Sequence, residues 1–226
     1  MYIMQMKIWN KLNKKPNKID IVLILALLPI TIFSVSVWGN EAGDILLFVG
    51  LAYCFLKSDI KIRRYMLLLV LVSYIFETAS VAAKYYTYSG TIGVPFWIAI
   101  GWGILGWLAF SLNKKIKLSD KICIIVFLVA SVLATFITKG SWFSIPITLV
   151  SLWMLSKASG FKMKFFVIVF FLSWLIDFSG TYFKLWSYGG ATGMLSDWVL
   201  LGLTYCVFLG VGLWLSKIER ENKQKN

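Results

Sequence analysis

The chain has 226 residues, of which 59% are hydrophobic and only 15% are charged, and its mean hydropathy is +0.79. Soluble domains are about 45–50% apolar and about 25% charged, so this composition excludes a soluble domain, a disordered chain and a disulfide-stapled scaffold. It indicates a multi-span membrane protein. In such a protein the net charge of +13 is interpreted first through the orientation of the spans in the membrane. Because the chain has no histidine, we expect no imidazole metal site, no His general base and no cofactor.

Eight apolar segments follow one another along the chain, and a transmembrane helix needs about 20 such residues. The second and sixth segments are short, and the first is expected to be retained because no A-x-A-like cleavage site follows it. Cys54, Cys123 and Cys206 lie within apolar runs and are interpreted as buried hydrophobic residues. We therefore predict an all-α membrane bundle of eight transmembrane helices. In chain order the segments are residues 21–39, 43–56, 65–83, 95–112, 121–138, 143–156, 165–183 and 195–215.

The basic residues alternate between the two ends of these segments. All but three of the 23 Lys and Arg residues lie on one side, and the other side carries only Lys84, Lys139 and Lys184. The positive-inside rule then places both termini in the cytoplasm. The same bias accounts for the net charge without a nucleic-acid partner, so the expected environment is the lipid bilayer.

An internal repeat at an offset of 100 residues divides the chain into residues 1–112 and 113–226. The pattern [ED]-x6-K-x-[YW]-x-Y-x-G-x2-G begins at Glu77 in the first half and at Asp177 in the second. Each half has four predicted spans, an even number, so the two halves have the same orientation and a pseudo-two-fold axis along the membrane normal is expected. We predict that Glu77 and Asp177 lie at the same depth and face one central cavity.

Of the ten acidic residues, only Glu77 and Asp177 lie inside apolar segments, whereas Asp20 is placed among the cytoplasmic basic residues. A carboxylate in the membrane costs about 2.5–3.5 kcal/mol and is a functional candidate by default, although an interhelical hydrogen bond is the structural alternative. At spacings of i, i+4, i+7 and i+11, further polar residues share a helix face with each carboxylate. These candidate substrate-binding residues are Ser73, Ser80 and Lys84 in the first half, and Ser173 and Lys184 in the second.

The outer loops that follow, residues 85–94 and 185–196, are rich in aromatic residues and glycine. They fit either an aromatic belt with tight turns or an aromatic mouth over the carboxylates. Gly101, Gly103 and Gly106 are predicted to allow close helix packing. The tryptophans at positions 97, 102, 107 and 174 are more typical of packing or of the belt.

A carboxyl group in an apolar pocket can stay protonated at neutral pH and then acts as a strong general acid. It can protonate an isoprenoid double bond to give a tertiary carbocation, which aromatic rings stabilise and which water or a neighbouring alkene then captures. With two carboxyl groups, one can serve as acid and the other as base. The same pair also suits a proton- or sodium-coupled transporter, and a non-catalytic structural membrane protein is the third reading. The residues alone do not distinguish among the enzyme, the transporter and the structural protein.

The stretch from Glu77 to Pro95, with Tyr86, Tyr88, a Gly-Val-Pro ending at Pro95 and then Trp102, resembles the carotenoid-biosynthesis membrane family that includes the bisanhydrobacterioruberin hydratases. The second half is similar through Asp177, Lys184, Trp186, Tyr188 and Gly193. The resemblance implies a polytopic enzyme, hydratase or cyclase, that acts on the end of an apolar isoprenoid substrate in a prokaryotic cytoplasmic membrane. It implies Glu77 and Asp177 as catalytic residues, and it adds aromatic residues to the substrate-binding candidates, namely Tyr86, Tyr88, Trp102, Trp186 and Tyr188.

Overall fold

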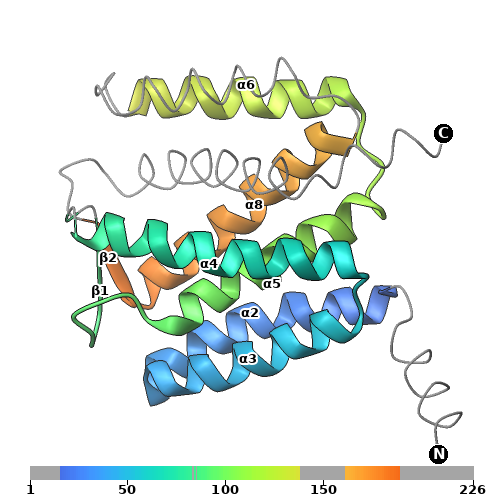
Figure 1. Ribbon diagram of the computed structural model, residues 1–226. Helices are drawn as coiled ribbons and strands as arrows, with labels where there is room; N and C mark the ends of the chain where they lie inside the picture. The colour runs from blue at the N-terminus through green and yellow to red at the C-terminus, as the bar shows by residue number, and fades with distance from the viewer. Residues whose placement is uncertain (1–15, 83, 85, 138–160, 189–226) are drawn as a thin grey trace, which may run out of the picture.

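The structure, a computed structural model, describes residues 16–82, 84, 86–137 and 161–188. Within these ranges the chain is mostly helical and forms six α-helices and one two-stranded sheet (Figure 1). The predicted segments 143–156 and 195–215 lie outside the described residues. The elements are α2 (Lys18–Trp38), α3 (Asn40–Leu56), α4 (Ile60–Ala82), β1 (Tyr86–Tyr88), α5 (Phe96–Asn113), α6 (Asp120–Ile137), α8 (Phe161–Tyr182) and β2 (Trp186–Tyr188).

Two helices, α2 and α4, begin before the apolar run that predicted them, because polar residues cap their first turns. The carboxylate of Asp59 accepts hydrogen bonds from the backbone N–H groups of Lys61 and Ile62, so α4 begins at Ile60. Between α2 and α3 the chain turns at Gly39, whose φ of 84° suits glycine. The predicted segments are therefore correct in kind within the described ranges and too short at these N-terminal ends.

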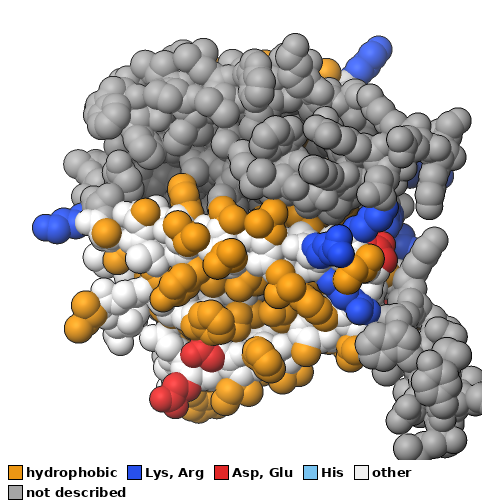
Figure 2. All heavy atoms as spheres, in the orientation of Figure 1, with side chains coloured by type: hydrophobic (Ala, Val, Ile, Leu, Met, Phe, Trp, Pro, Cys, Tyr) orange, Lys and Arg blue, Asp and Glu red, His pale blue; other side chains and the backbone are white. Residues whose placement is uncertain are grey.

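Four helices in the described ranges, α2, α4, α5 and α8, are long and apolar enough to cross a membrane. Hydrophobic side chains cover the outer face of α3 and α4, and Lys and Arg gather where these two helices connect (Figure 2). Phe48 of α3 and Leu71 and Ile75 of α4 are each about 60% exposed. Together with the four candidate membrane-spanning helices, an apolar surface of this extent indicates a membrane-associated protein.

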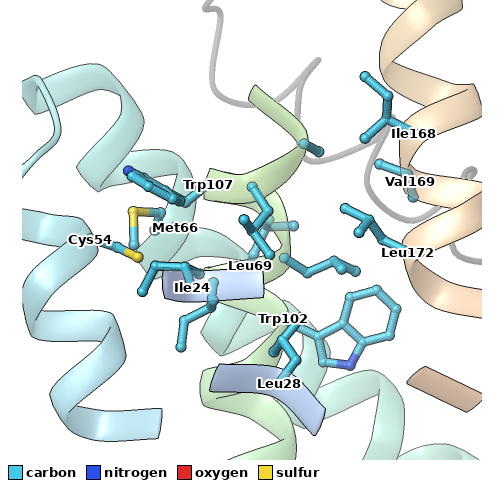
Figure 3. Close-up of a cluster of buried hydrophobic side chains, with 14 of the residues drawn as sticks. Ile24, Leu28, Cys54, Met66, Leu69, Trp102, Trp107, Ile168, Val169 and Leu172 are labelled. Atoms are coloured by element: carbon cyan, nitrogen blue, oxygen red, sulfur yellow. The ribbon is translucent and has the colours of Figure 1, made fainter. Parts of the chain in front are cut away.

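The core is built around α5, which packs against α2, α3, α4 and α8 and is buried along most of its length. Glycines bring α5 close to α4: a Cβ atom at Gly103 would lie 2.8 Å from Val70 Cγ2, and one at Gly106 would lie 2.9 Å from Tyr65 Cε1. The prediction of close helix packing at these two glycines is confirmed. Figure 3 shows the resulting cluster, with Trp102 and Trp107 between side chains of α2, α4 and α8.

Asp20, which was predicted to lie among basic residues, has its side chain buried at the first turn of α2. It forms a capping box with Asn17, accepts a hydrogen bond from the Tyr53 hydroxyl and lies 3.4 Å from the Lys57 ammonium group. Tyr53 and Lys57 are at the end of α3. Asp20 therefore links the ends of α2 and α3.

The two strands form an antiparallel ribbon in which Tyr86 pairs with Tyr188, Thr87 with Ser187, and Tyr88 with Trp186. The hydroxyl oxygens of Thr87 and Ser187 are 3.1 Å apart. The ribbon follows the ends of α4 and α8 and joins two segments that are 100 residues apart in sequence (Figure 1).

Candidate functional site

A cavity of about 60 Å³ lies between the helices next to the β1–β2 ribbon. Its volume exceeds the about 10–15 Å³ that a single water needs. Both carboxylates that the sequence singled out, Glu77 of α4 and Asp177 of α8, line it and are 2% exposed. The other lining residues are Leu28, Thr31, Ile32, Leu47, Tyr88, Trp97, Ile98, Gly101, Trp102, Leu105, Ser173, Ile176 and Trp186. A mostly apolar wall with a few convergent polar groups is typical of a small-molecule site.

Glu77 is held by two aromatic donors. Its Oε2 accepts a hydrogen bond of 2.9 Å from the Tyr88 hydroxyl, and its Oε1 accepts one of 2.9 Å from Trp102 Nε1. An indole N–H can only donate, whereas a phenol hydroxyl can also accept. A proton on Glu77 is therefore best accommodated at Oε2, beside the Tyr88 hydroxyl.

The wall around Asp177 has a different arrangement of polar groups. Ser173 is one helical turn before Asp177 on α8, and Trp186 follows on β2. Ser173 Oγ and Trp186 Nε1 are buried and have no hydrogen-bond partner in the described part of the chain. Buried polar atoms of this kind need an explanation, and both residues line the cavity.

The β1–β2 ribbon brings two aromatic side chains to the cavity as cross-strand partners, Tyr88 and Trp186. Their rings meet edge to face with centroids 6.0 Å apart, and the Trp97 ring centroid is 6.3 Å from that of Trp186. The Trp186 ring lies directly over Gly180, where any Cβ atom would overlap it. A further backbone hydrogen bond joins the two segments beside the ribbon: the N–H of Ser89 donates to the carbonyl oxygen of Leu185 at 2.8 Å.

Only some of the predicted site residues come together at the cavity. Glu77, Asp177, Tyr88, Trp102, Ser173 and Trp186 all line it. Ser73 and Ser80 are buried outside the lining, and the Ser73 hydroxyl donates to the carbonyl oxygen of Val70. Tyr86 and Tyr188 are backbone partners at one end of the ribbon.

Lys84 and Lys184 do not lie on the predicted helix face with the carboxylates. Their helices end at Ala82 and Tyr182, and both lysines are exposed in the turns that follow. Both adopt a left-handed backbone, with φ of 60° and 56°, and each backbone N–H donates to the carbonyl oxygen three residues earlier. The helical spacing therefore stops before these residues, and neither lysine lines the cavity.

One wall of the cavity was not predicted from the sequence. Leu28, Thr31 and Ile32 of α2 line it, and so does Trp97, which was attributed to packing or to the belt. The i, i+3, i+4 spacing on α2 marks one helix face, but several other faces of this chain are equally apolar. Finding this wall requires knowing that α2 packs beside α5 and α8.

In the described ranges, no group of three or more His, Cys, Asp or Glu side chains could hold a metal ion. Comparisons of the chain with protein-family models, with curated proteins and with solved structures find no match.

Proposed function

We propose that the protein is an intramembrane enzyme that protonates a terminal double bond of a carotenoid or related isoprenoid, followed by addition of water or by cyclisation. The observation that carries this proposal is the cavity itself. Two buried carboxyl groups from helices far apart in sequence share it, and aromatic rings supply much of the remaining wall.

Glu77 is the acid in this proposal. Its carboxyl group transfers a proton to one alkene carbon, which leaves a tertiary cation at the other. The rings of Trp97, Trp102 and Trp186 line the same cavity, and aromatic faces within about 6 Å stabilise a cation. In hydration, water forms the new C–O bond and gives a proton to Asp177. In cyclisation, a neighbouring alkene forms a C–C bond before the proton is lost.

The fold suits a substrate that dissolves in lipid. The helices around the cavity present apolar side chains outward, including Ile30 and Phe33 of α2. A carotenoid end group can enter such a site from the bilayer without crossing water. Together with the resemblance of the Glu77–Trp102 stretch to the carotenoid-biosynthesis family, this favours a polyene substrate.

We further infer eight transmembrane helices built as two four-helix repeats, residues 1–112 and 113–226. Three features support this inference: α4 and α8 end 100 residues apart, Lys84 and Lys184 share a left-handed backbone, and the ribbon has a symmetric register. A shift of 100 residues converts the pair Tyr86–Tyr188 into the pair Trp186–Tyr88, which is the other end of the same ribbon. The charge bias supports cytoplasmic termini in a prokaryotic cytoplasmic membrane.

The test is expression of the chain in bacterial cells that accumulate lycopene, followed by chromatography and mass spectrometry of the pigments. A product heavier by one water supports hydration, and a product of equal mass with altered absorption supports cyclisation. Glu77→Gln and Asp177→Asn should abolish the product. Glu41→Gln is the matched control, because Glu41 is exposed in the first turn of α3 and its loss should leave the product unchanged. An unchanged pigment profile with the protein present in the membrane contradicts the carotenoid substrate.

The paired carboxyl groups also suit proton- or sodium-coupled transport, since both come from helices long and apolar enough to cross a membrane and share one cavity. Proteoliposomes separate the two functions. Vectorial ion flux that Glu77→Gln abolishes would favour transport, whereas turnover of a lipid-embedded substrate without flux favours the enzyme.

A further inference from the structure

We infer that Ser173 Oγ and Trp186 Nε1 form a subsite for a water molecule, which Asp177 activates as the nucleophile of the reaction. This inference rests on the proposed function and assigns a separate chemical role to each side of the cavity. Glu77 delivers the proton, and the Asp177 side holds and deprotonates the water.

The polar groups on the two sides of the cavity differ in their hydrogen bonding. On the Glu77 side, the Tyr88 hydroxyl and Trp102 Nε1 already donate to the carboxylate. Ser173 Oγ and Trp186 Nε1 are 99% and 95% buried by residue, line the same cavity and lack hydrogen-bond partners within the described ranges. No group of the described residues compensates for their lost hydration, and a ligand in the cavity would do so.

The hydrogen-bonding capacity of these groups restricts which ligand can fit. An indole N–H only donates, so the ligand must present an acceptor to Trp186, whereas the Ser173 hydroxyl can donate or accept. A carboxylate only accepts, so a ligand that also contacts Asp177 must carry a proton. Water or an alcohol meets all three conditions, and the cavity is several times the size that one water requires.

The two halves of the chain differ at the positions that supply these polar groups. The residue 100 positions after Trp102 is Gly202, which has no side-chain donor, and the position equivalent to Trp186 is Tyr86. The counterpart of Ser173 is Ser73, whose hydroxyl donates to the carbonyl oxygen of Val70. The indole and hydroxyl groups that meet the ligand therefore belong to the second half alone.

In the reaction, Glu77 gives its proton to the alkene and a C–H bond forms. The water oxygen then forms a C–O bond with the cation, and a water proton passes to the Asp177 carboxylate. The net change is alkene plus water to alcohol, and the proton returns from Asp177 to Glu77 before the next turnover. Without a positioned water, the cation loses a proton from a neighbouring carbon instead, which gives an isomerised alkene. If a neighbouring alkene first forms a C–C bond with the cation, the later loss of a proton gives a cyclised product.

The first experiment tests the subsite without any turnover. In ¹⁵N-labelled protein in nanodiscs, the indole signal of Trp186 is assigned by its loss in Trp186→Phe, and magnetisation transfer from water to the indole proton is measured. We expect a direct water contact at Trp186, weakened at least threefold by Ser173→Ala and unchanged by the control Ser73→Ala. No water contact at Trp186 in the unmodified protein would overturn the inference, whatever the activity.

The second experiment tests the role of that water, with turnover in D₂O. Deuterium on carbon reports protonation, and added hydroxyl reports water capture. Ser173→Ala should keep deuterium incorporation within twofold while the ratio of hydrated to isomerised product falls at least tenfold, with Ser73→Ala again unchanged. An unaltered ratio in Ser173→Ala would overturn the assignment of the nucleophile. If the unmodified protein neither incorporates deuterium nor adds hydroxyl, the proposed function fails, and the indole experiment still decides the subsite.

Discussion

At the residue scale, the proposed function depends most on the carboxyl group of Glu77. This group is buried among apolar helices and accepts hydrogen bonds from Tyr88 and Trp102. Hydrogen bonds to a buried carboxyl group both orient it and compensate for its lost hydration. Orientation is what a general acid needs, since the proton must point at one substrate atom. The Trp102 indole supplies that constraint from α5, while Tyr88 supplies it from the ribbon.

Trp102→Phe removes the donor to Glu77 Oε1 and should lower the free energy of unfolding in detergent by about 1–3 kcal/mol. Part of any tryptophan truncation is lost packing, so the matched control is Trp107→Phe on the same helix. Trp107 is buried, and its Nε1 has no hydrogen-bond partner in the described part of the chain. Equal losses for the two variants would contradict a stabilising role for the Trp102–Glu77 bond.

Gly180→Ala should displace the Trp186 ring, because a Cβ atom at position 180 overlaps it. We expect a loss of about 1–3 kcal/mol in stability and a change in Trp fluorescence as the ring leaves the cavity wall. The control is Gly93→Ala, since a Cβ atom at Gly93 meets nothing within 4 Å. A Gly180→Ala protein with unchanged stability and fluorescence would disprove the close approach.

At the element scale, α5 is the helix on which the site depends, since it contacts α2, α3, α4 and α8 and contributes Trp97, Trp102 and Gly101 to the cavity. Its glycines set how closely α4, and with it Glu77, can approach. The packing of helices in lipid relies on such close contact, because lipid tails are as apolar as the side chains themselves.

Gly106→Ala should destabilise the α4–α5 contact by about 1–3 kcal/mol, since the new methyl group would meet the Tyr65 ring at 2.9 Å. On the same helix, a Cβ atom at Gly101 would lie 3.4 Å from Leu47 Cδ1, a contact that a small shift relieves. Thermal unfolding in detergent should therefore rank Gly106→Ala well below Gly101→Ala. The reverse order would mean that α4 and α5 pack differently.

The β1–β2 ribbon can be tested by a cross-link between its central residues. Thr87 and Ser187 are directly paired, and paired strand residues have Cα atoms about 4.5–5.5 Å apart, within the range of a disulfide. In a Cys206→Ala background, Thr87→Cys combined with Ser187→Cys should form an intramolecular disulfide on mild oxidation. Each single variant serves as the control, and peptide mass mapping identifies the bond. Failure of the double variant to cross-link would contradict the register.

How far the sequence could predict this architecture depended on the range of the interactions concerned. Apolar runs located the helices, and the repeated pattern found Glu77 and Asp177 without structural information. The end of α4 could not be predicted, because the left-handed turn at Lys84 leads into a strand whose partner is 100 residues away. The α2 wall around Thr31 was missed for a related reason, since the packing partner of a helix face is a long-range property.

At the scale of the whole molecule, the position of the cavity along the helices matters for function. Glu77 and Asp177 lie near the ends of α4 and α8 that lead into the ribbon, whereas Asp20, Tyr53 and Lys57 link α2 to α3 at the opposite end. If the Lys57 end faces the cytoplasm, as the charge bias predicts, the proposed site lies toward the outer side of the membrane. In that orientation we propose that it meets the end group of the polyene.

This orientation predicts that the two ends of α5 are accessible from opposite sides of the membrane. α5 has 18 residues and a length of about 27 Å at 1.5 Å per residue, close to the about 30 Å of a hydrocarbon core.

Ile92 precedes α5 in the loop after β1 and Lys117 follows it, and both are exposed. Cys54 and Cys123 are buried, so a Cys206→Ala background suits labelling with a membrane-impermeant maleimide. In intact cells, Ile92→Cys should react at once, whereas Lys117→Cys should react only after permeabilisation. Labelling of Lys117→Cys alone in intact cells would mean that the protein is inserted the other way round, with the carboxylate cavity on the cytoplasmic side.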